Sequence, residues 1–170
     1  MIKSLWQKII FKLRNDGPLS LLKALQKNLD ELKQVPALLQ EMKKQKENFS
    51  EYVDFVFETQ NGMIRPLQVR AEISQAMELI SKYKPKFVLE IGTAKGGTLF
   101  LHTRAAAKNA KIISVDLPGG PFGGGYVPWR RFLYRKFARD SQKIYLLQEN
   151  SHEVATHEKV KSILNGEKLN

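Results

Sequence analysis

The sequence contains no cysteine and only three histidines among its 170 residues. The absence of cysteine excludes a disulfide framework and any thiolate metal site, and it fits a cytosolic protein. The histidines are not spaced from one another, or from a pair of carboxylates, as metal ligands are, so we expect no metal site. No apolar run approaches the roughly 20 residues that cross a bilayer. The first residues also lack the uninterrupted apolar core of a signal peptide. We therefore expect a cytoplasmic protein.

Acidic residues are scarce as well, with 17 Asp and Glu against 28 Lys and Arg, a formal net charge of +11. This balance favours acidic partners such as nucleic acid, anionic lipid or phosphorylated substrates. An equally good interpretation is that further acidic residues lie in a part of the protein beyond this chain. Basic and aromatic side chains alternate between Trp129 and Arg139 and could grip nucleic acid. Helical spacing explains that cluster as well, so we do not expect nucleic acid as a partner.

The first 62 residues are predicted to form a helical appendage. Within residues 2–14 the apolar side chains recur at helical spacing, and lysines lie mostly off that face. A basic amphipathic helix with a tryptophan can lie in a membrane interface. The alternative is that this face packs on the rest of the chain or on another subunit of a homo-oligomer. The apolar residues concerned are Ile2, Leu5, Trp6, Ile9, Ile10 and Leu13.

Breaks in the chain divide this appendage into further helices. Residues 15–18, Asn-Asp-Gly-Pro, are predicted to end the first helix, and Pro18 can open the next one. Pro36 predicts a further break or kink, residues 37–57 are predicted to be helical again, and Asn61-Gly62 is a turn signal. Residues 67–83 are predicted to form the helix before the first strand. The second helix carries a stripe of leucines at positions 21, 22, 25, 29 and 32.

The segment Phe87–Thr98 is typical of a strand, a glycine turn and the start of a helix. A short apolar run carries one acid, Glu90, and glycines follow at positions 92, 96 and 97. Glycine lets the backbone approach a ligand where a Cβ atom would collide. Turns of this kind hold nucleotide-like cofactors at the carboxyl end of a strand.

The glycine spacing argues against two cofactor classes. A P-loop ends in Gly-Lys-Ser/Thr, whereas Lys95 precedes the glycine pair here, so no lysine is placed for a β- or γ-phosphate. The dinucleotide fingerprint is poorly met because Gly92-Thr93-Ala94 lacks its second glycine. The longer turn suits a ligand without a pyrophosphate, and an NAD-type nucleotide enzyme stays as the less favoured alternative.

A second apolar and β-branched run, Lys111–Asp116, predicts the next strand. Its terminal Asp116 follows Glu90 at about the separation expected for the acid that ends the next strand of a βαβ unit. A carboxylate there can accept both hydroxyls of a ribose. From residue 87 onward strands alternate with helices, which favours an α/β fold with a parallel sheet. The Gly- and Pro-rich loop 117–128, with Phe122 and Tyr126, is either a mobile cover over the site or an ordinary connection.

These motifs carry a family resemblance. Residues 88–97 and 113–116 resemble motifs I and II of class I S-adenosylmethionine-dependent methyltransferases. The segments Asp116–Tyr126, Trp129–Arg130, Leu133–Arg135 and Gln142–His152 resemble one branch of that superfamily, methyltransferase family 24 or cephalosporin hydroxylase-like. The resemblance covers roughly residues 66–169. It implies a Rossmann-like sheet, S-adenosylmethionine as the cofactor, and methyl transfer to a small-molecule or carbohydrate substrate.

The resemblance also implies roles for single residues. Glu90 would organise the turn or meet the methionine part of the cofactor, and Asp116 would hold the ribose. Gly92 and Ala94 would expose backbone to the cofactor, while Gly96 and Gly97 would allow close packing. Leu117 could flank the adenine, and Asn150 and Ser151 would meet its edge. The predicted cofactor-binding set is Glu90, Gly92, Thr93, Ala94, Gly96, Gly97, Asp116, Leu117, Asn150 and Ser151. No catalytic residue is assigned.

The family pattern continues into a fourth strand, whereas this chain stops where that strand should begin. We therefore expect residues 63–170 to be the amino-terminal part of a methyltransferase domain, with about three parallel strands, preceded by the helical residues 1–62. A base or a metal, if used, should lie in the carboxyl half. The alternative function is a non-catalytic binding or membrane-surface docking module in which the helical appendage does the work.

Overall fold

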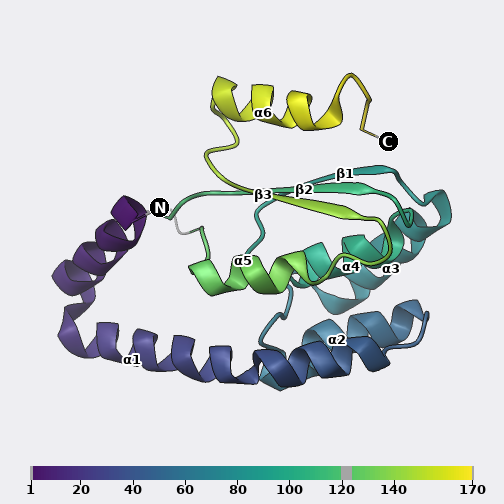
Figure 1. Cartoon of the computed structure of the whole chain (residues 1–170). Helices are drawn as coiled ribbons and strands as arrows, with labels where there is room; N and C mark the ends of the chain where they lie inside the picture. The colour runs from purple at the N-terminus through teal and green to yellow at the C-terminus, as the bar shows by residue number, and fades with distance from the viewer. Residues whose placement is uncertain (1, 120–123, 170) are drawn as a thin grey trace.

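A computed structural model describes residues 2–119 and 124–169, with the backbone alone for residues 2–16. Within these ranges the chain forms six helices and three strands (Figure 1). In chain order they are α1 (Ile2–Lys44), α2 (Phe49–Gly62), α3 (Arg70–Tyr83), β1 (Phe87–Ile91), α4 (Gly97–Ala105), β2 (Lys111–Asp116), α5 (Pro128–Arg135), β3 (Lys143–Gln148) and α6 (Val154–Leu164). The alternation of strands and helices after residue 86 confirms the predicted α/β class.

The three strands form one parallel sheet in the order β1-β2-β3. Val88 pairs with Ile112 and Ile112 pairs with Ile144, so the strands lie in register and their carboxyl ends meet at one edge. Figure 1 shows α3, α4 and α5 on one face of this sheet and α6 on the other. Parallel strands need crossover connections, and strands covered on both faces are rich in apolar residues, as β2 is at Ile112, Ile113 and Val115.

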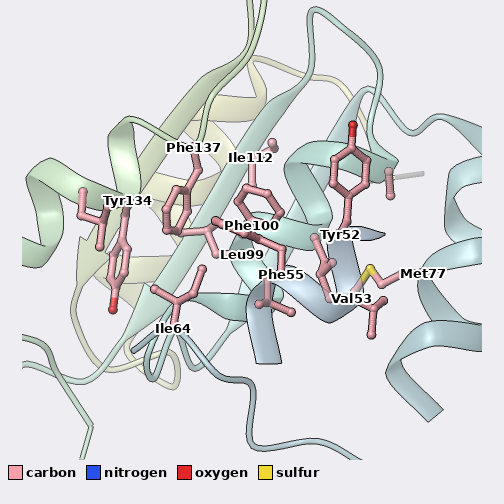
Figure 2. Close-up of a cluster of buried hydrophobic side chains, with 14 of the residues drawn as sticks. Tyr52, Val53, Phe55, Ile64, Met77, Leu99, Phe100, Ile112, Tyr134 and Phe137 are labelled. Carbon is pink, nitrogen blue, oxygen red and sulfur yellow. The ribbon is translucent and has the colours of Figure 1, made fainter. Parts of the chain in front are cut away.

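The main core lies between the sheet and the helices on the α4 side, and Phe100 is at its centre (Figure 2). The ring of Phe100 meets Phe137 edge-on at 5.5 Å between centroids and Tyr52 at 6.0 Å. Phe55 of α2 lies 5.0 Å from the same ring. Aromatic pairs in these orientations add attraction beyond the area they bury. This core therefore joins α2 to α4 and holds the helix that follows the glycine turn.

The core contains residues from both sides of position 62, so the helical region and the sheet region share it. The domain boundary predicted at residue 62 stays a prediction. A smaller cluster on the opposite face places Leu164 of α6 over Ile113 and Val115 of β2. Each face of the sheet is therefore covered by helices.

Several helix boundaries differ from those that the sequence predicts. Pro36 does not end its helix, because α1 runs on to Lys44 and buried Val35 and Leu38 hold this stretch against the body. The helix predicted over residues 37–57 is interrupted at 45–48, where the Asn48 side chain accepts a hydrogen bond from the amide of Ser50 and caps α2. Tertiary packing outweighs the local proline cost in the first case, and in the second the Asn48 cap starts a new helix, α2.

Other breaks lie where the sequence predicts them. Gly17 adopts a left-handed φ of 76° and bends α1, and Figure 1 shows the bend. The turn at Asn61-Gly62 is also present, because Gln60, Asn61 and Gly62 all have positive φ. The third helix begins at Arg70, not at Leu67, so residues 66–69 form a loop. Gly120 to Gly123, including the predicted loop residue Phe122, lie outside the described residues. Among the described residues, no helix has the length and apolarity that crossing a membrane requires.

Candidate functional site

The site is built where β1 ends and the glycine turn begins. Gly92 takes a left-handed φ of 90°, and its amide donates to the carbonyl of Val115 at 2.8 Å, which continues the strand pairing into the turn. A Cβ atom at Gly92 would have no neighbour within 4 Å among the described residues. Glycine is needed here for its backbone conformation, and no described atom crowds this side of its backbone.

Asp116, the last residue of β2, forms hydrogen bonds with both this turn and the glycine-rich loop. Its Oδ2 accepts the amides of Thr93 at 3.2 Å and Ala94 at 3.3 Å, while its Oδ1 accepts the amide of Gly125 at 3.1 Å. The side chain is buried. An ionised carboxylate can accept about four hydrogen bonds. Within the described part of the chain, backbone amides therefore fill three of these positions, and about one is left for a ligand.

A second carboxylate lies behind the turn. The hydroxyl of Ser114 donates to Oε2 of Glu90 at 2.7 Å, so the 2.7 Å contact between Ser114 and Thr93 is a donation from the Thr93 hydroxyl. The other oxygen of Glu90, Oε1, has no hydrogen-bond partner among the described residues. A buried carboxylate with one unpaired oxygen favours its neutral form.

The pKa of Glu90 is accordingly raised to about 7. Burial is the main cause, the negative charge of Asp116 adds to it, and the hydrogen bond from Ser114 acts in the opposite direction. Near neutral pH, Glu90 is therefore divided between its protonated and ionised forms. The protonated form can donate from the otherwise unpaired oxygen, and the ionised form can accept there.

The glycine pair that follows serves close packing. A Cβ atom on Gly96 would lie 2.4 Å from Cε1 of Tyr134, and one on Gly97 would lie 2.2 Å from the carbonyl oxygen of Ile64. The hydroxyl of Tyr134 also donates to the carbonyl of Ala94 at 3.0 Å. Tyr134 of α5 therefore fixes the shape of the turn from the side away from its opening.

A cavity of about 400 Å³ opens between the turn, the end of β2 and the loop before α3. Six members of the predicted cofactor-binding set line it: Gly92, Thr93, Ala94, Gly96, Gly97 and Asp116. Four members do not: Glu90, Leu117, Asn150 and Ser151.

The four non-lining residues have other surroundings. Glu90 lies behind Thr93, and Leu117 lies next to Gly124. Asn150 and Ser151 belong to the turn after β3, where the Asn150 side chain accepts the amide of His152. The carbonyl of Ser151 contacts the ring of His157 at 2.7 Å. Their predicted contact with the adenine stays a prediction.

Sequence reasoning missed part of the lining. Pro66, Leu67 and Gln68 form one wall, and the hydroxyl of Thr98 donates to the side-chain oxygen of Gln68 at 3.1 Å. Pro66 indicates in the sequence that this segment is a loop, because a proline and the residue before it rarely lie inside a helix. Lys95, Gly124 and Gly125 complete the lining, and the glycine-rich loop that holds the last two was expected near the site.

The described residues contain no group of three or more His, Asp or Glu side chains arranged to hold a metal ion. No protein-family model matches the chain, and comparison with curated proteins finds no match. The methyltransferase resemblance therefore rests on the motifs alone and stays a hypothesis.

Proposed function

We propose that this chain binds S-adenosylmethionine in the cavity beside Asp116. In this proposal it supplies the cofactor-binding half of a methyltransferase whose acceptor is a small molecule or a sugar. The observation that carries the proposal is the position of the Asp116 carboxylate. It lies in the lining of a cavity of about 400 Å³, directly beside a glycine turn whose backbone is uncrowded at Gly92. Cavities that hold small ligands range from about 300 to 1,000 Å³.

The residues present fit this cofactor at two points. Asp116 has acceptor capacity for a hydroxyl of a ribose, and the turn 92–94 offers backbone at close range to the rest of the ligand. The loop Pro66–Gln68 contributes the exposed side chain of Leu67 and the side-chain amide of Gln68 to the same cavity. A cofactor with an apolar ring and a hydroxylated sugar suits such a mixture of apolar and polar groups.

Asp116 can accept both ribose hydroxyls only if it gives up a contact. Two hydroxyls need two acceptor positions, whereas about one is open beside the amides of Thr93, Ala94 and Gly125. The contact with Gly125 is the one to release, because Thr93 and Ala94 are fixed by the turn. Cofactor binding would therefore shift the glycine-rich loop at residues 124–125.

S-adenosylmethionine supplies an electrophilic methyl group when bound. The contribution of this chain would be to hold the cofactor rigidly and leave one side of the cavity open to an acceptor. Much of the acceleration would come from placing the acceptor in line with the methyl group. No residue of this chain is assigned as a base.

Isothermal titration of the full chain with S-adenosylhomocysteine tests the proposal. We expect a Kd in the micromolar range for the wild type, and binding at least about tenfold weaker for Asp116→Asn, which loses the charge with little change of shape. Glu158→Gln, which removes a surface carboxylate from α6, is the matched control and should bind like the wild type. Circular dichroism should show all three proteins to be folded.

Two results would contradict the proposal. A folded wild type that does not bind S-adenosylhomocysteine would remove its basis. Displacement of bound S-adenosylhomocysteine by NADH at lower concentration than by S-adenosylmethionine would favour the NAD-type alternative.

A further inference from the structure

A second cavity lies beside α1, and we call it the α1 groove. Its volume of about 490 Å³ is within the range of cavities that hold small ligands. One face of α1 forms one wall, because the lining residues of this helix recur every three or four positions. Residues 60–63, at the end of α2, form another wall. The lining residues of α1 are Lys23, Gln26, Lys27, Asp30, Glu31 and Gln34.

The α1 groove adjoins the cavity beside Asp116, because Lys95 lines both of them. The buried guanidinium of Arg130 fixes this boundary. It donates to the carboxylate of Glu31 at 2.7 Å and to the carbonyls of Met63 and Lys95. All three of these partners line the groove. A ligand in the groove would therefore lie next to a ligand in the cavity, which is where a methyl acceptor must be placed.

The acidic side chains of the groove are already matched by positive charge. Glu31 is paired with Arg130, and Asp30 lies 3.5 Å from Lys33. Both oxygens of Asp30 also accept the side-chain amide of Gln26 at 3.1 Å. These two acids therefore need no cation from a ligand.

The lysines of the groove are not matched in this way. Lys23, Lys27 and Lys95 have no ion-pair partner among the described residues. Three cations around one small cavity attract an anion, and lysine is a common phosphate-binding residue. The net charge of +11 also favours acidic partners such as phosphorylated substrates. The groove therefore suits an anionic ligand.

The rest of the lining suits a ligand with hydroxyl groups. Among the described residues that line the groove, only Met63 has an apolar side chain. Gln34 and Asn61 contribute side-chain amides, which both donate and accept hydrogen bonds, as hydroxyls do. A large apolar ligand would find little apolar surface here to bury.

The wall at residues 60–62 has a strained backbone. Gln60 and Asn61 have positive φ values of 47° and 57°, which are uncommon for residues other than glycine. The carboxylate of Glu41 holds this turn, because it accepts the hydroxyl of Thr59 and the side-chain amide of Gln60, each at 2.6 Å. Strain of this kind persists where surrounding contacts fix it, and it clusters at ligand-binding sites.

We propose that the α1 groove binds the methyl acceptor, and that this acceptor is an anionic sugar. Lys23, Lys27 and Lys95 hold its phosphate or carboxylate, and the amides of Gln34 and Asn61 bind its hydroxyls. The proposal rests on the proposed function, because an acceptor needs the cofactor in the adjoining cavity. It adds the charge of the acceptor and the part of the protein that selects it.

Isothermal titration of the full chain with glucose 6-phosphate and, separately, with glucuronate tests the proposal. We expect at least one of them to bind at least about tenfold more tightly than glucose and inorganic phosphate do. The sugar that binds shows whether the groove prefers a phosphate or a carboxylate. Binding of neither sugar would overturn the proposal, and so would equally tight binding of glucose or of inorganic phosphate.

The variant Lys23→Gln/Lys27→Gln should bind the anionic sugar at least about tenfold more weakly, because the groove loses two charges. Both side chains are exposed, so the variant should fold normally, which circular dichroism checks. Lys82→Gln/Lys86→Gln removes two exposed lysines outside both cavities and is the matched control, which should bind like the wild type. Equal binding by all three proteins would assign the sugar to another surface and overturn the proposal.

Titration with S-adenosylhomocysteine separates this proposal from the cofactor proposal. Lys23→Gln/Lys27→Gln should keep its affinity for S-adenosylhomocysteine, and Asp116→Asn should keep its affinity for the anionic sugar. The sugar should also bind to protein saturated with S-adenosylhomocysteine. Displacement of S-adenosylhomocysteine by the sugar would place both ligands in one cavity and overturn the proposal for the groove. Sugar binding without S-adenosylhomocysteine binding would contradict the cofactor proposal and, with it, the role of the sugar as acceptor.

Discussion

The guanidinium of Arg130 in α5 lies 2.7 Å from the carboxylate of Glu31 in α1, across 99 positions of sequence. Arg130 is 8% exposed and Glu31 is 17% exposed. The same guanidinium donates to the carbonyls of Met63 and Lys95. One buried cation therefore joins α1, the end of α2 and the glycine turn to α5.

We expect Glu31→Ala to lower the free energy of unfolding by about 2–3 kcal/mol, because it leaves the buried guanidinium without its counter-ion. Urea denaturation measures this change. The control is Glu47→Ala, whose pair with Arg139 involves a carboxylate that is 78% exposed, and which should cost less than about 1 kcal/mol. Equal effects of the two substitutions would show that the Arg130 contact contributes no more than a surface pair.

Gly96→Ala should destabilise the protein by about 3 kcal/mol. The new Cβ atom would lie 2.4 Å from the ring of Tyr134, in a backbone conformation with φ of 89°, so overpacking adds to backbone strain. Gly166→Ala is the control for strain alone, since its φ is 83° and no described atom lies within 4 Å of the new group. We expect about 1 kcal/mol there, measured by the same denaturation. If Gly96→Ala lowers the free energy of unfolding no more than Gly166→Ala does, the clash with Tyr134 is excluded.

Glu90 should make stability depend on pH. Its pKa rises from 4.5 to about 7 on folding, so its contribution is fully present below about pH 4.5 and is lost as pH rises through 7. His102 acts in the opposite sense, because burial lowers its pKa from 6.5 to about 4 and its contribution is lost as pH falls through that range. In the wild type the two effects partly cancel between about pH 4.5 and 6.5.

Glu90→Gln should separate these two effects. As pH rises from 4.5 to 8, the wild type should lose about 3 kcal/mol of unfolding free energy relative to Glu90→Gln. Urea denaturation across this range measures the difference. A pH-independent difference would mean that Glu90 ionises normally in the folded protein.

The amide signal of Gly125 should change when a ligand occupies the cavity. If Asp116 accepts two ribose hydroxyls, the amide of Gly125 loses its 3.1 Å hydrogen bond to Oδ1. We expect its resonance in a ¹H–¹⁵N spectrum to move upfield, and its exchange with solvent to quicken, when S-adenosylhomocysteine is added. The amide of Gly92, which donates to Val115, should keep its protection. Binding that leaves the Gly125 amide unchanged would limit Asp116 to a single hydroxyl.

The sequence was sufficient for the parts of the fold that local pattern controls. The apolar runs at 87–91 and 111–116 lie in adjacent parallel strands, and the acid that ends the second meets the turn that follows the first. Periodicity, turn residues and the pairing rules of parallel strands carry this information. Asp116 and the 92–94 turn therefore lie together, as expected.

Two of the errors come from contacts between segments that are distant in sequence. Pro36 predicts a break or kink, but no break occurs, because Val35 and Leu38 are buried against the body and the helix continues. The loop 66–68 lines the cavity because Gly97 lets Pro66 approach the start of α4. Pro66 marks the loop in the sequence, but no local pattern shows where either segment packs.

Lys95 lines the cavity, and its carbonyl accepts a hydrogen bond from Arg130. This carbonyl therefore connects the cavity to Arg130. A ligand that displaces this carbonyl changes the free energy with which Arg130 holds Glu31, and therefore the attachment of α1. Thermodynamic reciprocity requires the converse to be equal in size: whatever pulls on α1 alters the affinity of the turn for its ligand by the same factor. Arg130 is thus the contact through which α1 and the turn would be coupled.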